Sequence, residues 1–153
     1  MHPSSGIRSL HQLAHLYGVQ TAYYDVAHHR CPASTESLLA ILKALGAPVE
    51  AVNDTVPALR QRRQETWQRP LEPVTVAWYG EPVMIEARLP AAIADTILPG
   101  HLTLEDGEQR TYQWAAANSR ATAIAEVEGI DYVAKRFELP DTLPLGYHRF
   151  TLQ

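Results

Sequence analysis

The chain has 153 residues, of which 46% are hydrophobic and 20% charged, with a net charge of −4 and one cysteine. This composition fits one or two small globular units and excludes a closed (β/α)₈ barrel, which needs roughly 250 residues. No apolar run approaches the roughly 20 residues of a membrane-spanning helix. The first residues also lack the pattern of a secretory signal, so we expect a cytoplasmic location and no membrane partner.

The charged residues do not indicate a nucleic-acid partner. The net charge is acidic, and the sequence contains no basic stripe of the kind that neutralises a phosphate backbone. The local exception is a cluster of arginines at positions Arg60, Arg62, Arg63 and Arg69. Glutamine and glutamate are interspersed among them, so we interpret this cluster as the solvent-exposed face of a helix.

The first third of the chain predicts three short helices. Apolar residues recur there at three- and four-residue spacing. The expected helices cover residues 7–17, 34–45 and 54–67. Ser4 or Ser5 is expected to cap the first helix and Asp54 the third. Pro70 and Pro73 then end the helical region.

From residue 74 the apolar pattern changes to the alternation that predicts strands. The expected strands cover residues 74–79, 83–89, 102–105, 112–114, 132–139 and 147–152. The first two form a predicted hairpin across residues 80–82, and the next two a hairpin across the Asp106-Gly107 turn. Residues 115–129 are alanine-rich and fit a strand pair, a short helix or a loop equally well.

Several short strands separated by turn signals, with no crossover helices between them, favour an antiparallel sandwich over a parallel sheet. The predicted fold class is therefore α+β. A helical subdomain is expected over residues 1–70 and an immunoglobulin-like β-sandwich over residues 71–153. The boundary falls near the prolines at 70 and 73.

The sequence contains no motif that indicates a catalytic, metal or cofactor site. His11 and His15 are spaced to share one helix face, and His28 and His29 lie near Cys31, but no acidic partner accompanies them. We expect surface roles for these histidines. Phosphate-loop, dinucleotide and nucleophile-elbow patterns are absent, so we expect no cofactor, no metal and no catalytic residue.

The aromatic residues of the predicted hairpins are more informative. Large aromatics in sandwiches usually fill the core, so Trp78 and Trp114 are expected there. Tyr79 lies on the opposite strand face from Trp78 and is the better surface residue. Exposed rings can stack on sugar faces, which makes Tyr79, Tyr112 and Trp114 the candidate glucan-binding residues.

Three segments together resemble a known family. Residues 10–26 and 37–46 are similar to the start of bacterial 4-α-glucanotransferases of the amylomaltase type. Residues 143–150 read Leu-Pro-Leu-Gly-Tyr-His-Arg-Phe and resemble the Leu-Pro-x-Gly-Tyr-His strand entry of the N-terminal sandwich in longer members. The resemblance spans nearly the whole chain. In this reading Tyr147 is expected to resemble the tyrosine corner of sandwiches.

The resemblance implies an N-terminal accessory region of an enzyme that transfers α-1,4-glucan segments. The family's aspartate nucleophile and glutamate acid/base lie in a downstream barrel, so no catalytic residue carries over to these positions and the chain alone is expected to be inactive. Its implied partner is the catalytic barrel of the same polypeptide, together with maltooligosaccharide or glycogen if the region holds sugar. Of these two roles, scaffolding is favoured over glucan holding.

Two other classes of function stay open at the level of sequence. One is an independent carbohydrate-binding module, or a sandwich from another glucan-active enzyme. The other is a protein-interaction domain. Exposed Tyr79, Tyr112 and Trp114 would favour sugar binding, whereas a separate exposed apolar patch would favour a docking surface.

Overall fold

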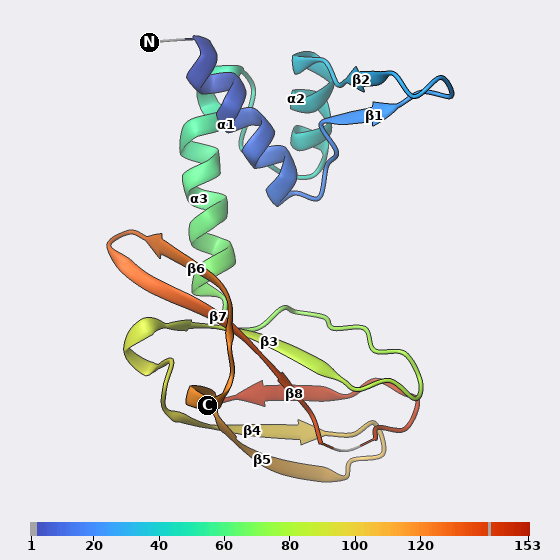
Figure 1. The fold of residues 1–153 in the computed structure, drawn as a ribbon, viewed down its shortest axis with the longest axis vertical. Helices are drawn as coiled ribbons and strands as arrows, with labels where there is room; N and C mark the ends of the chain where they lie inside the picture. The colour runs from blue at the N-terminus through green and yellow to red at the C-terminus, as the bar shows by residue number, and fades with distance from the viewer. Residues whose placement is uncertain (1–2, 141) are drawn as a thin grey trace. The chain divides into compact units, whose positions relative to one another are not determined.

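The computed structural model describes residues 3–140 and 142–153 and divides the chain into two compact units, Met1–Thr66 and Trp67–Gln153 (Figure 1). The first unit is helical and the second is built from antiparallel strands. Together they confirm the predicted α+β class with a β-sandwich. No helix in the described ranges is long and apolar enough to cross a membrane.

The helical unit contains the three expected helices and a small hairpin. Its elements are α1 (Pro3–Leu16), β1 (Ala22–Tyr24), β2 (Arg30–Pro32), α2 (Thr35–Ala44), the 3₁₀ turn η1 (Val52–Asp54) and α3 (Thr55–Gln68). α1 begins at Pro3, so Ser4 and Ser5, the expected caps, lie inside its first turn. Ser34 caps α2, because its hydroxyl accepts the Ser37 amide at 3.1 Å.

The apolar faces of the helices meet in one core. Its buried residues are Leu10, Leu13, Ala14, Leu38, Leu42, Ala47, Val49 and Ala58. The arginine cluster of α3 is not uniformly solvated as expected. The guanidinium of Arg62 lies 4.4 Å from the ring centroid of Tyr17, a cation–π contact that half-buries it.

The second unit is a sandwich of two three-stranded sheets within the described residues. Its strands are β3 (Met84–Pro90), β4 (Ile97–Thr103), β5 (Gln109–Ala115), β6 (Ala121–Val127), β7 (Ile130–Glu138) and β8 (Arg149–Leu152). The sheet orders are β3-β7-β6 and β5-β4-β8, and every pairing is antiparallel. The short 3₁₀ turns η2 (Ala91–Ile93) and η3 (Ala116–Asn118) connect the strands.

The core of the sandwich follows from alternation along its strands. β3 and β4 each bury every second residue. The buried residues are Ile85, Ala87, Leu89, Leu98, Leu102, Leu104, Ala116, Phe137 and Leu139. The predicted hairpin across Asp106-Gly107 is confirmed as β4–β5. Residues 115–129, for which the sequence left three alternatives, form the end of β5, the turn η3 and the strand β6.

The predicted hairpin between residues 74–79 and 83–89 is wrong. Residues 74–78 have no regular secondary structure, and β3 pairs with β7 instead. Near its other edge, β3 meets the chain at Leu71, which forms a bridge with Ala87, and the Arg88 amide donates to the Pro70 carbonyl at 2.8 Å. The following residues leave the sheet, so the alternation of Val74, Val76 and Trp78 lies in an exposed loop.

Candidate functional site

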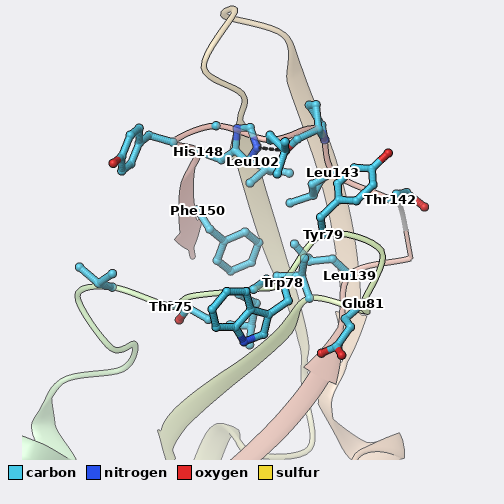
Figure 2. Close-up of a pocket in the computed structure, with 18 of the residues that line it drawn as sticks. Thr75, Trp78, Tyr79, Glu81, Leu102, Leu139, Thr142, Leu143, His148 and Phe150 are labelled. Carbon is cyan, nitrogen blue, oxygen red and sulfur yellow. Dashed lines mark hydrogen bonds between the residues drawn. The ribbon is translucent and has the colours of Figure 1, made fainter.

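The sandwich unit carries a pocket of about 360 Å³. The pocket is formed by residues 71–86 on one side and residues 142–150 on the other, with Leu102 of β4 and Leu139, which follows β7, contributing to its floor. Figure 2 shows Trp78 near Phe150 and Tyr79 on the side where Thr142 and Leu143 lie. A concave, mostly apolar pocket with a few polar groups is the usual form of a ligand site.

The first wall is held by a tight turn. The backbone N–H of Glu81 donates to the carbonyl of Trp78 at 3.0 Å, and Gly80 between them has a φ of +82°. A positive φ at the third residue is the requirement of a type II turn, which glycine meets without a steric penalty. The turn presents Trp78 and Tyr79 with 74% and 76% of their surfaces exposed.

The opposite wall is fixed by His148. Its Nδ1 accepts the backbone N–H of Glu105 at 3.2 Å, and its Nε2 lies 2.9 Å from the carbonyl of Pro144. A backbone N–H can only donate a hydrogen bond and a carbonyl can only accept one. The neutral ring that carries its proton on Nε2 therefore satisfies both partners. His148 therefore ties the segment before β8 to the β4–β5 turn.

The floor of the pocket is the sandwich core itself. Ile85, Leu102 and Leu139 are buried, and Phe150 is half-buried with its ring centroid 5.8 Å from that of Phe137. Ile85, Leu102 and Phe150 lie on β3, β4 and β8, and Leu139 directly follows β7. The floor is therefore as rigid as the sheets.

Polar groups at the rim fall into two kinds. Glu86 is paired with Arg136 at 2.9 Å, and Glu72 is paired with Arg88. In contrast, the carboxylate of Glu81 makes no hydrogen bond or ion pair across residues 3–140 and 142–153. The rim thus offers one free negatively charged acceptor beside two exposed aromatic rings.

The structure does not bring the three predicted aromatic residues together. Tyr79 lies in the pocket. Tyr112 and Trp114 lie on β5, half-buried against the sandwich core. The Trp114 ring centroid is 3.7 Å from that of Phe137, and its Nε1–H donates to the Ser119 hydroxyl at 2.9 Å, so the expectation that Trp114 belongs with the core is met.

Two other expectations for aromatic residues are wrong. Trp78 was expected in the core but is exposed, because its segment leaves the sheet after Leu71. Tyr147 was expected as a tyrosine corner, but 90% of its surface is exposed and it lines the pocket. The neighbouring exposed apolar residues are Val74, Val76 and Leu145.

The histidines noted in the sequence, at positions 11, 15, 28 and 29, are not part of a metal-binding group among the described residues. In the part of the chain that the structure describes, no group of three or more His, Cys, Asp or Glu residues is placed to hold an ion. His29 instead lies 3.3 Å from a carboxylate oxygen of Asp25, whose other oxygen accepts the amides of Ala27 and His29 at 2.8 Å each. These contacts order the tip of the β1–β2 hairpin.

Known relatives match this chain over both its helical unit and its sandwich unit. The 4-alpha-glucanotransferases of Mycobacterium bovis and Mycobacterium tuberculosis are each 33% identical to this chain over 146 residues, which is 95% of the chain and 19% of those proteins. The crystal structure of amylomaltase from Corynebacterium glutamicum is 30% identical with a TM-score of 0.67 and is matched over 96% of this chain and 21% of its own. The chain therefore spans about a fifth of the length of these relatives.

The family comparison agrees with the fold. Residues 70–153 match the family described as the MalQ N-terminal beta sandwich domain. This range begins just before the Leu71 bridge and includes all six strands of the sandwich. Because the match covers more than half of its residues, the chain belongs to the MalQ N-terminal beta sandwich domain family.

Proposed function

We propose that this chain is a non-catalytic accessory region of a 4-α-glucanotransferase, an enzyme that transfers α-1,4-glucan segments in the cytoplasm. The observation that carries the proposal is the extent of the matches. The chain aligns over 95% of its own length with enzymes of that name but over only 19% of theirs. The remaining four-fifths of such a polypeptide would supply the catalytic barrel and would be the principal partner of this region.

Scaffolding is the role that the fold supports directly. Each unit has its own buried core, and the strands of the sandwich pair in two antiparallel sheets. A region of this kind folds around its own contacts and then offers a rigid surface to the rest of the polypeptide. We also propose that the helical subdomain and the sandwich meet at the boundary predicted from the sequence, between residues 70 and 71.

The experiment that tests the non-catalytic role uses this chain alone. Incubation with maltotriose, followed by chromatography of the products, is expected to leave the sugar unchanged. Appearance of longer and shorter maltooligosaccharides would contradict the proposal, because transfer would then need catalytic groups within these residues.

A second role, glucan holding, is favoured by one specific observation. Tyr79 is exposed and lines a preformed pocket, as a sugar-stacking residue must. Tyr112 and Trp114 are half-buried on β5 outside this pocket, so this second role rests on Tyr79. A protein-interaction domain would not bind sugar at this surface, so titration with a maltooligosaccharide separates it from glucan holding. An independent sugar-binding module would bind sugar as well, and the absence of glucan transfer by the longer natural polypeptide would identify it.

A further inference from the structure

We propose that the pocket between residues 71–86 and 142–150 binds an α-1,4-linked glucose oligosaccharide, with Trp78 and Tyr79 as its stacking residues. This inference rests on the proposed function for its ligand class, since the matched relatives are named as glucanotransferases. It adds a site that includes Trp78, which the sequence pattern assigned to the core, and it excludes Tyr112 and Trp114, which lie on β5 outside the pocket.

The exposure of two adjacent aromatic rings needs a physical reason. Aromatic side chains stabilise a fold mainly by burying their surface, yet Trp78 and Tyr79 leave 74% and 76% of theirs in water. They are not on a loosely tethered loop end, because the Trp78–Glu81 hydrogen bond closes the turn that carries them. A backbone that is already closed into a turn loses little conformational freedom when a ligand binds to it.

A pyranose ring matches what the pocket offers. Its C–H face stacks on an aromatic ring, while its hydroxyl groups need hydrogen-bonding partners around that face. The free carboxylate of Glu81 and the hydroxyls of Thr75 and Thr142 supply such partners beside the rings. Hydrogen bonds to an ionised carboxylate are shorter and stronger than those between neutral groups, so Glu81 is the expected principal acceptor.

We expect a curved oligosaccharide to follow the two walls of the pocket. Its walls are pinned on one side by the turn at Gly80 and on the other by the His148 contacts to Glu105 and Pro144. The α-1,4 linkage turns each glucose relative to the one before, so the chain bends and follows a concave wall. A β-1,4-linked chain is straight, so we expect it to follow these walls poorly.

The test follows the indole N–H signals of the 153-residue chain by ¹H–¹⁵N NMR during titration with maltoheptaose. The chain has three tryptophans, so the Trp78 signal is assigned by its loss in Trp78→Phe. We expect the Trp78 signal to shift as maltoheptaose is added to a concentration of about 10 mM. This concentration range detects millimolar dissociation constants. The signals of Trp67 and Trp114 serve as internal controls and are expected to stay in place.

Two variants and a second sugar sharpen the result. Tyr79→Ala is expected to weaken maltoheptaose binding at least about fivefold, because one stacking contact is lost. Tyr23→Ala, which changes an exposed tyrosine on β1 outside the pocket, is the matched control and is expected to leave binding unchanged. Cellohexaose, with β-1,4 linkages, is expected to cause no shift at the same concentration.

Three outcomes overturn the inference: an unshifted Trp78 signal, equal shifts with cellohexaose, or undiminished binding in Tyr79→Ala. The first outcome, combined with a Trp78 signal that differs between this chain and the longer natural polypeptide, would assign the pocket to intramolecular docking. Failure of the proposed function is distinguishable, because it is measured by glucan transfer in that longer polypeptide and does not depend on sugar binding here.

Discussion

Lys135 is a buried charged residue on β7 whose partners explain its position. Its Nζ donates to the carbonyls of Ala94 and Ala116 at 2.6 and 2.8 Å and lies 3.0 Å from a carboxylate oxygen of Asp95. The ammonium therefore connects the η2 and η3 turns, which follow β3 and β5, to the strand between β3 and β6. A buried charge is tolerated here because every one of its donors has an acceptor.

We predict that Lys135→Met lowers the free energy of unfolding by about 2–4 kcal/mol, because two buried carbonyls lose their donor. Urea denaturation followed by tryptophan fluorescence measures this change. Arg136→Met on the same strand is the matched control, since its ion pair with Glu86 is exposed and is worth at most about 1 kcal/mol. Equal losses in the two variants would show that the Lys135 contacts contribute nothing beyond an ordinary surface pair.

Glycine is required at position 100 on β4 because the ring of Phe150 lies close to the backbone there. A Cβ atom at this position would lie 2.8 Å from Cζ and 3.0 Å from Cε2 of Phe150. We predict that Gly100→Ala destabilises the sandwich by about 1–3 kcal/mol through overpacking, measured as a lower Tm. The double variant Gly100→Ala with Phe150→Leu is expected to show less than the sum of the two single losses. An additive result would mean that the ring is not what excludes the methyl group.

Asp54 was expected to cap α3, but its carboxylate accepts the amides of Glu50 and Ala51, upstream of the helix, at 2.9 and 2.8 Å. The Glu50 hydrogen bond first, and then the Ala51 bond, lower the pKa of Asp54 below its ordinary value of 3.8. Its stabilising contribution is therefore fully present above pH 3.8 and is lost as the pH falls through the lower folded-state pKa.

We accordingly predict that the Tm difference between the native chain and Asp54→Asn is largest near neutral pH and shrinks below pH 3.8. Asparagine keeps an acceptor oxygen but lacks the charge, so the comparison isolates ionisation. Thermal melts followed by circular dichroism over a pH series provide the measurement. A difference that is independent of pH would show that the lowered pKa does not contribute to folding.

At the scale of elements, the turn that carries Trp78 and Tyr79 depends on Gly80. We predict that Gly80→Ala, at a φ of +82°, costs about 1 kcal/mol locally and speeds hydrogen exchange of the Glu81 amide about fivefold. Gly80→Asn is expected to have a smaller effect, since asparagine tolerates positive φ better. Exchange rates that match the native chain in both variants would mean that another contact holds the turn.

The helices were predictable because several local signals agreed. Apolar spacing placed α1, α2 and α3, the expected start of the second helix at Ser34 lies at the cap of α2, and Asp106-Gly107 marked the β4–β5 hairpin. β6 was not predictable, because six of its seven residues, Ala121 to Glu126, are at least partly exposed and the strand shows no alternation in burial. The strand predicted over residues 74–79 is wrong for the opposite reason. These residues alternate as a strand does, but they form an exposed wall of the pocket.

The candidate site was only partly predictable. Tyr79 was correctly predicted to lie at the surface, from its place opposite Trp78. The pocket itself requires residues 71–86 and 142–150 to meet across the sandwich, and no local pattern encodes a contact between segments so far apart. The Gly-Tyr-His motif was selected from its resemblance to a family, and the structure adds that His148 holds one wall of the pocket.

For the whole molecule, the length of the chain relative to the length of its relatives connects its fold with its proposed function. The chain has room for two small units with separate cores, and it matches about a fifth of each relative. The family resemblance stated from the sequence is confirmed, because residues 70–153 match the MalQ N-terminal beta sandwich domain and form a sandwich with its own buried core. The division of labour between this region and the rest of an enzyme is the central claim.

That claim is tested most directly by maltotriose disproportionation in the natural polypeptide that contains residues 1–153, compared with this chain alone. We expect the longer polypeptide to redistribute maltotriose into shorter and longer oligosaccharides, whereas the 153-residue chain is expected to leave it unchanged. A natural polypeptide without this activity, or transfer by the chain alone, would contradict it.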